Sequence, residues 1–243
     1  MRLATANLLH GRALPEDVVD PDRLRAAARL LDADVLGLQE VDREQPRSSG
    51  LDQTAVVAAA LGADHHRFVA ALSGNPGVQW TAGDQPGPAY GVGLVSRLPV
   101  RAWHVLRMPA APARWPMPVP GGRRAVWIRD EPRVVLAAEL DGLTVATAHL
   151  SFVPGWNVHQ LRRVIRWLRG LPGPQVLLGD LNMPRPVATT TSGWTSLVTA
   201  KTFPAPAPRL QIDQVLASQP LPVRSGRAVL LPVSDHRALT VDL

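Results

Sequence analysis

The chain has 243 residues, of which 46% are hydrophobic, so it is long and apolar enough to bury a sizeable globular core. It has no cysteine, which excludes disulfide frameworks and thiolate zinc sites and leaves oxygen or imidazole ligands for any metal. The net charge is +6, and Lys201 is the only lysine among 26 basic residues, an arginine bias that fits either a GC-rich genome or an anionic substrate.

Apolar segments with strand composition alternate with helical patterns along the chain. Residues 22–31 follow Pro21, and residues 51–61 end at Gly62, as expected for the start and the stop of helices. A third helix is predicted over residues 158–168, where apolar residues recur on one face and arginines occupy the others. Strands are predicted over residues 3–8, 35–38, 68–72, 92–95, 134–140, 144–150, 176–178, 212–216 and 238–243.

Two stretches rich in glycine and proline, residues 73–88 and 107–122, are predicted to be loops, and long loops are often functional. No internal repeat or break in composition divides the sequence, so we expect one domain over residues 1–243 and a monomer. The N-terminus lacks a signal-peptide pattern, and no apolar run reaches the roughly 20 residues that span a bilayer. We therefore expect a cytoplasmic protein without a transmembrane segment.

The segment VLLGDLNMP, residues 176–184, places a carboxylate and a carboxamide directly after a predicted strand. The apolar run ends at Gly179, and Asp180 and Asn182 follow it. Open α/β sheets bind ligands at this end of their strands. An Asx turn that merely closes the strand also explains an isolated D-x-N pattern, so the interpretation depends on the rest of the chain.

Other predicted strands also carry polar residues near their ends, of types that suit phosphate chemistry. Each of them alone has a structural explanation as well, so their order along the chain is the informative feature. The order is Asn7 in ATANLLHG, Glu40 in VLGLQEVDRE, His149 in VATAHLS, Asp180 and Asn182 in LLGDLNMP, Asp213 in LQIDQVLAS, and Asp235 with His236 in VSDHRALTV.

With these motifs in this order, the chain resembles the endonuclease/exonuclease/phosphatase superfamily. This magnesium-dependent group includes deoxyribonucleases, apurinic endonucleases, inositol-polyphosphate phosphatases and neutral sphingomyelinases. The matches extend from Asn7 to His236, and GDLN followed by ID and a terminal SDH is a specific combination. YGVGLVSRLPV is also similar to a strand of the family. The resemblance implies a four-layer α/β sandwich, in which two packed mixed β-sheets are flanked by helices and the site lies at one end.

The resemblance also implies a site for Mg²⁺ (or Mn²⁺). Glu40 would be the main metal ligand, with Asn7 beside it and Asp235 near the metal. The absence of cysteine agrees with such a site, because these ions prefer carboxylate and amide oxygens.

The remaining motif residues would act on the phosphate and on the attacking water. The resemblance implies that Asp180 orients and deprotonates the water, while Asn182 holds the water or a phosphate oxygen. His149 and His236, the latter oriented by Asp213, would hydrogen-bond the phosphoryl oxygens, and one of them would assist the leaving group. A carboxylate beside a histidine keeps the imidazole charged near neutral pH, which suits this role.

The sequence departs from the nucleases of the family in ways that bear on the substrate. Nucleases usually carry several tyrosines around the phosphate, whereas Tyr90 is the only tyrosine here, which counts against a DNA-repair role. Residues 101–129 contain six arginines and no acidic residue, together with Trp103, Trp115 and Trp127. This stretch could stack on bases or meet an anionic lipid surface. Alternatively, Trp103 and Trp127 fill the core and the arginines are solvated.

The sequence thus favours a magnesium-dependent phosphodiesterase or phosphatase. Its phosphoester substrate could be a nucleic acid, a phospholipid head group, an inositol phosphate or a small phosphodiester. A rival hypothesis is a catalytically silent module of the same fold that binds phosphate or nucleic acid, although such a module would have no need for the full residue set. A serine hydrolase is disfavoured because the G-x-S-x-G motif is missing.

Overall fold

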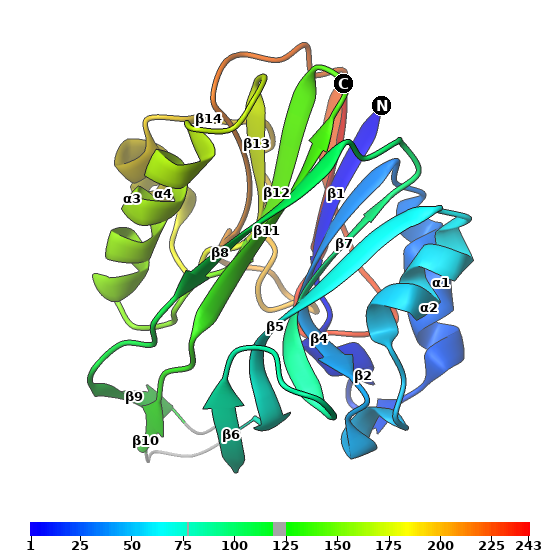
Figure 1. The fold of residues 1–243 in the computed structure, drawn as a ribbon, viewed down its shortest axis with the longest axis vertical. Helices are drawn as coiled ribbons and strands as arrows, with labels where there is room; N and C mark the ends of the chain where they lie inside the picture. The colour runs from blue at the N-terminus through cyan, green and yellow to red at the C-terminus, as the bar shows by residue number, and fades with distance from the viewer. Residues whose placement is uncertain (77, 119–124) are drawn as a thin grey trace.

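The computed structural model describes residues 1–76, 78–118 and 125–243, which form two large β-sheets packed face to face (Figure 1). The seven-stranded sheet has the order β16 (Ser225–Val229), β17 (Ala238–Asp242), β1 (Arg2–Asn7), β4 (Val35–Arg43), β7 (Ala89–Ser96), β5 (His65–Asn75) and β6 (Gln79–Ala82). The six-stranded sheet has the order β14 (Thr195–Ser196), β15 (Asp213–Ala217), β13 (Gln175–Asp180), β12 (Leu143–His149), β11 (Arg133–Leu140) and β8 (Ala102–Met108).

Among the described residues, two short antiparallel pairs and six helical segments complete the fold. The pairs are β2 (Arg12–Ala13) with β3 (Val18–Val19), and β9 (Arg114–Pro118) with β10 (Ala125–Arg129). The α-helices are α1 (Pro21–Leu31), α2 (Gln53–Leu61), α3 (Trp156–Leu168) and α4 (Arg185–Ser192), and the short 3-10 helices are η1 (Leu9–Gly11) and η2 (Pro46–Ser48).

Each large sheet is mixed, because one pair of neighbouring strands in it runs parallel. These pairs are β1 with β4 and β12 with β13. A parallel pair needs a crossover connection, and α1 and α3 supply the two crossovers. The remaining neighbours in both sheets run antiparallel.

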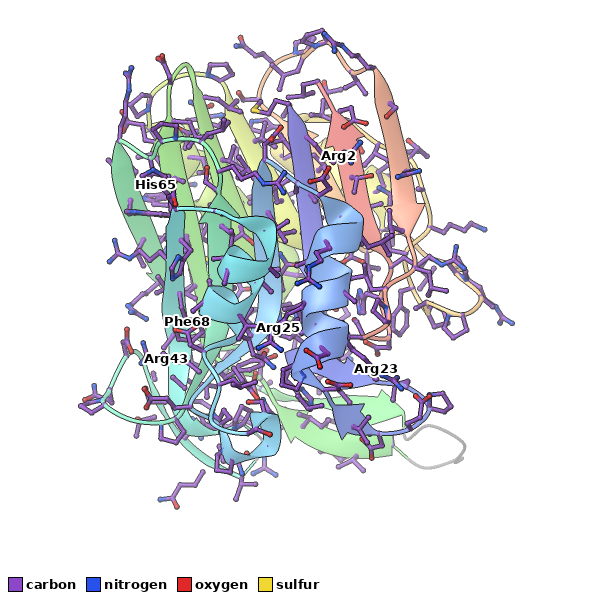
Figure 2. All side chains as sticks on the ribbon, turned by 90° about the vertical axis from the view of Figure 1, so that its right-hand side faces the viewer. Arg2, Arg23, Arg25, Arg43, His65 and Phe68 are labelled. Atoms are coloured by element: carbon purple, nitrogen blue, oxygen red, sulfur yellow. The ribbon has the colours of Figure 1, made fainter. Side chains whose placement is uncertain are left out.

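Three apolar clusters hold four layers together. One cluster lies between the sheets, a second packs α1 and α2 on the seven-stranded sheet, and a third packs α3 and α4 on the six-stranded sheet. Figure 2 looks onto the outer face that α1 and α2 cover. The predicted four-layer α/β sandwich is therefore confirmed. The cluster between the sheets includes Leu3, Val35, Leu94, Leu136, Val145, Val176 and Leu178.

The ends of the predicted helices follow local capping chemistry. The carboxylate of Asp20 accepts the backbone N–H of Asp22 at the start of α1, and that of Asp52 accepts the N–H of Ala55 at the start of α2. Gly62 ends α2 in the left-handed conformation, with φ of +63°. The second helix therefore starts two residues later than the predicted residue 51, because its N-cap is Asp52.

The polar ends of several strands meet at one end of the sandwich. β1, β12 and β13 end there with Asn7, His149 and Asp180. β15 runs antiparallel to β13, so its first residue, Asp213, pairs in register with Asp180. β17 likewise runs antiparallel to β1, and the segment before it carries Asp235. In Figure 1 both chain termini lie at the opposite end.

Both stretches that were predicted to be loops contain strands. Residues 73–88 include the end of β5 and all of β6, and residues 107–122 include the end of β8 and all of β9. For these segments the prediction was wrong. The prolines of β9 are tolerated because their missing N–H is not needed by a neighbour, and β6 is an edge strand of four residues without proline, too short to give a clear pattern. Residues 119–122 of the second stretch lie outside the described part of the chain.

The two tryptophans proposed as core residues lie in different environments. Trp103 on β8 packs against the core between the sheets. Trp127 on β10 is 63% exposed, so the hypothesis that it fills the core was wrong. The patterns also missed β8, β16 and α4 as elements, because edge strands and a two-turn helix carry little periodic signal.

In the described ranges, no helix combines the length and the apolar composition that crossing a membrane requires.

Candidate active site

Asp180 is presented by the close approach of two neighbouring strands. It is the last residue of β13, and Asn182 follows in the left-handed conformation, with φ of +51°. The preceding Gly179 has a φ of +143°, and a Cβ there would lie 1.9 Å from the backbone oxygen of Ala148 on β12. Only glycine fits this position without moving the strands. The close approach aligns His149 with Asp180 in register.

The two carboxylate oxygens of Asp180 have different surroundings. Oδ1 accepts the backbone N–H of Asn182 at 2.9 Å, which is the Asx turn considered from the sequence. Oδ2 accepts a hydrogen bond from the side-chain amide of Asn7 at 3.1 Å. It also lies 3.7 Å from Nε2 of His149 and 3.8 Å from Nε2 of His236. Asp180 therefore takes part in both arrangements: Oδ1 forms the Asx turn, and Oδ2 faces the cluster of polar side chains.

Burial raises the pKa of Asp180, and the nearby negative charge of Asp213 raises it further. The charge of His236 and the hydrogen bonds from Asn182 and Asn7 act in the opposite direction but do not cancel the rise. A carboxylate whose pKa is raised holds a transferred proton more readily than an ordinary aspartate does. Asp180 thus has the protonation chemistry of a general base.

The side chain of Asn182 is fixed by His149 and its neighbour. Its amide nitrogen lies 3.1 Å from Nε2 of His149 and donates to the backbone oxygen of Leu150 at 3.0 Å. Burial lowers the pKa of His149 well below the ordinary value, and the charges of Arg133 and His236 add to this effect. A neutral His149 accepts at Nε2, so both amide hydrogens of Asn182 are used and its oxygen remains as an acceptor.

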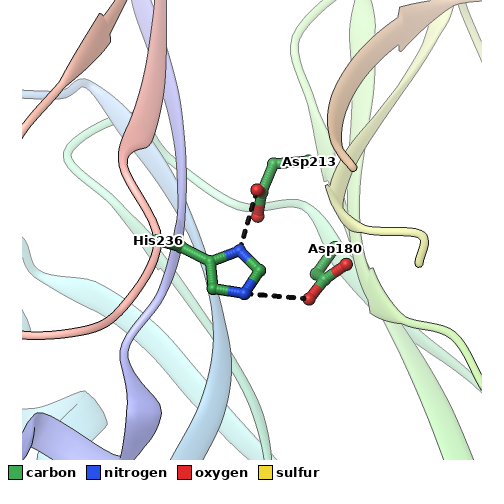
Figure 3. A group of neighbouring side chains, drawn as sticks. All are labelled: Asp180, Asp213 and His236. Atoms are coloured by element: carbon green, nitrogen blue, oxygen red, sulfur yellow. Dashed lines mark hydrogen bonds and ion pairs between the residues drawn. The ribbon is translucent and has the colours of Figure 1, made fainter. Parts of the chain in front are cut away.

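His236 forms a buried pair with Asp213, as Figure 3 shows. The ring donates from Nδ1 to Oδ2 of Asp213 at 2.9 Å, and Nε2 points toward Asp180. Burial by itself would lower the pKa of His236, but Asp213, through its charge and its hydrogen bond, raises it to about 10, with help from Asp180 and Asp235. The ring is packed against Phe203, with 4.9 Å between centroids. His236 is therefore an oriented imidazolium.

Glu40 lies in a β-bulge rather than at the end of a strand. The register between β4 and β7 shifts between Leu38 and Val41, and Glu40 adopts a left-handed φ of +53°. β4 continues beyond it, so the prediction that the strand ends there was wrong. The amide of Asn7 donates to Oε1 of Glu40 at 3.0 Å and to Asp180 at 3.1 Å. Asn7 thus connects the carboxylates of the two sheets.

The chemistry around Glu40 fits a divalent cation. Burial raises the pKa of Glu40, and Asp235 raises it further, while the hydrogen bond from Asn7 lowers it. A carboxylate whose pKa is raised by burial and by a second carboxylate is stabilised as an anion by a positive ion beside it. Glu40, Asp235 and the amide oxygen of Asn7 offer the hard oxygen ligands that Mg²⁺ and Mn²⁺ prefer.

A second group of ligand atoms suits a metal less well. Single atoms of Asp180, Asp213 and His236 lie within 4.8 Å of one another. A metal bound to His236 needs an unprotonated ring nitrogen, whereas the partners of His236 raise its pKa to about 10. We therefore assign this group to hydrogen bonding and proton chemistry.

Two residues of α3 that the sequence patterns missed support the site. Asn157 donates to the backbone oxygen of Asn182 at 2.8 Å, and Gln160 accepts the backbone N–H of Ser151 at 2.8 Å. Both side chains are buried. Their spacing of three places them on one helical face. Two side-chain amides on the buried face of a helix could therefore have been recognised from the sequence as candidates for supporting the site.

A second supporting group lies beside Glu40 on the seven-stranded sheet. Arg47 holds the buried Asp42 with two hydrogen bonds, of 2.8 Å and 2.7 Å, and its guanidinium lies 5.5 Å from the ring centre of Tyr90. Burial raises the pKa of Tyr90 well above its ordinary value, and the charge of Glu40 contributes. The single tyrosine of the chain is thus a protonated, buried neighbour of the site.

The profile of the Endonuclease/Exonuclease/phosphatase family matches residues 4–236, which include every residue of the site described above. The chain belongs to this family. Members of the family are hydrolases that include phosphatases and nucleases. No curated protein matches the chain in sequence.

Solved structures of family proteins have the same fold. An endonuclease/exonuclease/phosphatase protein from Beutenbergia cavernae is 25% identical, with a TM-score of 0.67 over 99% of this chain and 70% of its own. A mannosyl-6-phosphatase from Bacteroides thetaiotaomicron is 15% identical, with a TM-score of 0.68 over 100% of this chain and 98% of its own. Sphingomyelinase C from Streptomyces griseocarneus is 15% identical, with a TM-score of 0.65 over 99% of this chain and 98% of its own.

Proposed function

We propose that the protein hydrolyses phosphoester bonds with the help of Mg²⁺ or Mn²⁺. The observation that carries this proposal is the position of Oδ2 of Asp180. It accepts from Asn7 at 3.1 Å and lies 3.7 Å and 3.8 Å from His149 and His236. A base with a raised pKa therefore lies among groups that can hold phosphoryl oxygens. Membership of a family of hydrolases supports the same conclusion.

In this proposal, Asp180 and Asn182 act on the attacking water. One water proton passes to Oδ2 of Asp180 as the water oxygen attacks phosphorus opposite the leaving oxygen. The side-chain oxygen of Asn182 accepts the other water hydrogen, because both amide hydrogens of this residue are used by His149 and Leu150. The sequence left open whether Asn182 holds the water or a phosphate oxygen, and this bonding pattern favours the water.

The two histidines bind the phosphoryl group in different ways. His236 carries a positive charge that Asp213 stabilises, so its Nε2–H neutralises negative charge that develops on phosphoryl oxygens. His149 is neutral and accepts at Nε2, so its remaining donor is Nδ1–H. His236 is consequently the residue that can pass a proton to the leaving oxygen.

Glu40, Asp235 and Asn7 would hold the metal. A bound Mg²⁺ or Mn²⁺ would neutralise phosphoryl oxygens and stabilise the leaving oxygen. In this arrangement the hydrogen bond from Asn7 to Asp180, 3.1 Å long, keeps the base in a fixed position relative to the ligands. The shared amide explains why a polar residue ends β1 at this point.

The test is a panel assay with added Mg²⁺. Bis-p-nitrophenyl phosphate, p-nitrophenyl phosphate, plasmid DNA, RNA and sphingomyelin are compared, because the family contains both phosphatases and nucleases. We expect hydrolysis of at least the activated diester or monoester, its loss in excess chelator, and its return with Mg²⁺ or Mn²⁺. Full activity in chelator contradicts the metal requirement. Tight phosphate binding without any turnover supports the silent binding module instead.

A further inference from the structure

The hairpin of β9 and β10 projects from the end of the sandwich where the candidate active site lies. It is inserted between β8 and β11, whose residues Met108 and Arg133 pair in register. On the other side of β11, Val135 pairs with Ala148, next to His149. In Figure 1 the hairpin and β6 lie together at the end opposite the chain termini. The hairpin therefore borders the approach to the site.

The base of this hairpin is tied to the body of the protein. The buried Asp130 accepts the backbone N–H of Ala111 at 2.7 Å and a hydrogen bond from Arg133 at 2.9 Å. Gln160 donates to the backbone oxygen of Pro109 at 3.2 Å, and its other amide atom accepts from Ser151. The same side chain thus holds both the hairpin base and the segment that follows His149. The base of the hairpin is consequently fixed in position relative to the site.

The described residues of the hairpin expose large apolar side chains on both of its faces. Trp115 and Ile128 are opposite each other in the register and are 37% and 41% exposed. Trp127 is 63% exposed and lies on the other face, since neighbouring residues of a strand alternate. Val78, beside β6, is 80% exposed. Monomeric proteins rarely gather exposed apolar residues in this way without a binding role.

The charge around this surface is positive. No acidic residue occurs from residue 85 to residue 129. Arg114 and Arg129 pair across the base of the hairpin, and the guanidinium of Arg129 lies 4.9 Å from the ring centre of Trp80 on β6. Arginine beside exposed tryptophan is typical of surfaces that meet anionic head groups.

We propose that this hairpin, which exposes Trp115 and Ile128 on one face, Trp127 on the other, and Arg114 and Arg129 at its base, docks the protein on an anionic phospholipid bilayer. Two observations favour lipid over other occupants. A flat protein partner covers one face of a hairpin, whereas exposed apolar side chains lie on both faces here, and a hairpin that enters the head-group region of a bilayer can bury both. Aliphatic side chains such as Ile128 cannot stack on bases, which disfavours a single-stranded nucleic acid. Docking would bring the candidate active site close to a phosphoester at the bilayer surface. Only this link to hydrolysis rests on the proposed function; the binding itself does not.

The test measures binding of the full chain to vesicles, in chelator so that no turnover contributes. Vesicles of phosphatidylcholine with 30 mol% phosphatidylglycerol, roughly the anionic content that attracts basic surface segments, are compared with pure phosphatidylcholine. We expect co-sedimentation with the anionic vesicles and a shift of tryptophan fluorescence to shorter wavelength. Because hydrolysis is not measured, loss of the proposed function leaves this result unaffected, and loss of binding leaves the proposed function unaffected.

Matched variants separate the contributions to binding. Ile128→Ser should weaken binding by about tenfold, since it removes buried apolar surface. Trp127→Leu should retain most of the binding, because it stays apolar. Arg114→Gln should weaken binding to anionic vesicles by about fivefold and leave binding to neutral vesicles unchanged. Leu30→Ser is the control, because Leu30 is 51% exposed on α1 near the opposite end of the sandwich. Melting curves verify that each variant is folded.

Several outcomes overturn the proposal. They are the absence of binding to either vesicle, or equal binding by wild type and Ile128→Ser. The wild type could instead bind a labelled single-stranded oligonucleotide. If Trp127→Leu abolished that binding and Ile128→Ser did not, the surface would be reassigned to nucleic acid. A concentration-dependent dimer in analytical ultracentrifugation that Ile128→Ser dissociates would reassign it to a second copy of this chain.

Discussion

The surroundings of His149 and His236 differ although the two rings lie at similar distances from the same oxygen of Asp180, 3.7 Å and 3.8 Å. Both rings are largely buried, and burial lowers the pKa of each. Asp213 reverses this effect at His236, whereas Asn182 supplies only an amide at His149 and Arg133 adds a positive charge nearby. Asp213, helped by Asp180 and Asp235, therefore keeps the pKa of His236 high, whereas burial and Arg133 keep that of His149 low.

The largest effect is expected from replacing Asp180, whose Oδ2 lies near Nε2 of both histidines. Asp180→Asn should lower turnover of an activated phosphodiester by about 10²- to 10⁴-fold, because it removes the proposed general base and keeps the shape of the side chain. The melting temperature should change little. The measurement is a rate beside a melting curve, and a loss of stability that parallels the loss of rate would favour a purely structural turn.

The next largest effect should come from the carboxylate outside the histidine pair. Glu40→Gln should raise the Mg²⁺ concentration for half-maximal rate by about 10- to 100-fold, because it removes the charged ligand from the oxygen set. The pH dependence set by His236 should remain close to that of wild type at saturating metal. An unchanged metal requirement would place the metal elsewhere, for example at Asp180 and Asp213.

A third variant makes the two histidines alike by removing the carboxylate. In the native protein the pKa of His236 is raised from 6.5 to about 10, so its protonation contributes fully to the free energy of unfolding below pH 6.5, and this contribution is lost as the pH rises through about 10. The Asp213→Asn variant should lower this pKa by about one to three units. The alkaline limb of the rate and of the unfolding free energy should both move to lower pH.

Two controls accompany the Asp213→Asn variant. His236→Ala should remove the alkaline limb altogether. The double variant should be little slower than His236→Ala alone, since residues that act as a unit are not additive. Additive losses with an unchanged pH profile would mean that Asp213 only stabilises the strand that it begins.

The smallest effect should come from making His149 resemble His236. Asn182→Asp places a carboxylate where an amide now lies 3.1 Å from Nε2 of His149. The pKa of His149 should rise by about one to three units, which proton NMR of the imidazole ring can follow. Asn182→Ser, which adds no charge, should leave that pKa low. A low pKa in both variants would show that Arg133 and burial dominate at this position.

The motifs include residues that the structure brings together, but the sequence predicted the elements around them less well. Asn7, His149 and Asp180 end strands as expected, because short apolar runs bounded by polar residues are a strong local signal. Asp213 instead begins a strand, yet it reaches the same place since β15 is antiparallel to β13. Sequence patterns do not reveal strand direction, so they do not predict that Asp213 and Asp180 lie in register.

Other features depend on tertiary contacts that no local pattern contains. The hairpin of β9 and β10 has proline in its strands and exposed apolar residues, so it resembles a loop by composition. Asn157 supports the site through one bond to the backbone of Asn182, a contact that only the packing of α3 creates. The protonation difference between His149 and His236 depends on distances of a few ångströms, which sequence spacing does not give.

The strained backbone of the bulge at Glu40 affects which variants a selection for thermal stability would recover. A non-glycine residue with a φ of +53° carries backbone strain, which costs roughly 1 to 3 kcal/mol at such positions. Glycine adopts this conformation without strain, so a screen for heat resistance would favour Glu40→Gly. That variant loses the carboxylate proposed to bind metal. A library ranked by melting temperature alone would therefore enrich chains in which the proposed metal site is destroyed, and position 40 must be held fixed when this fold is stabilised.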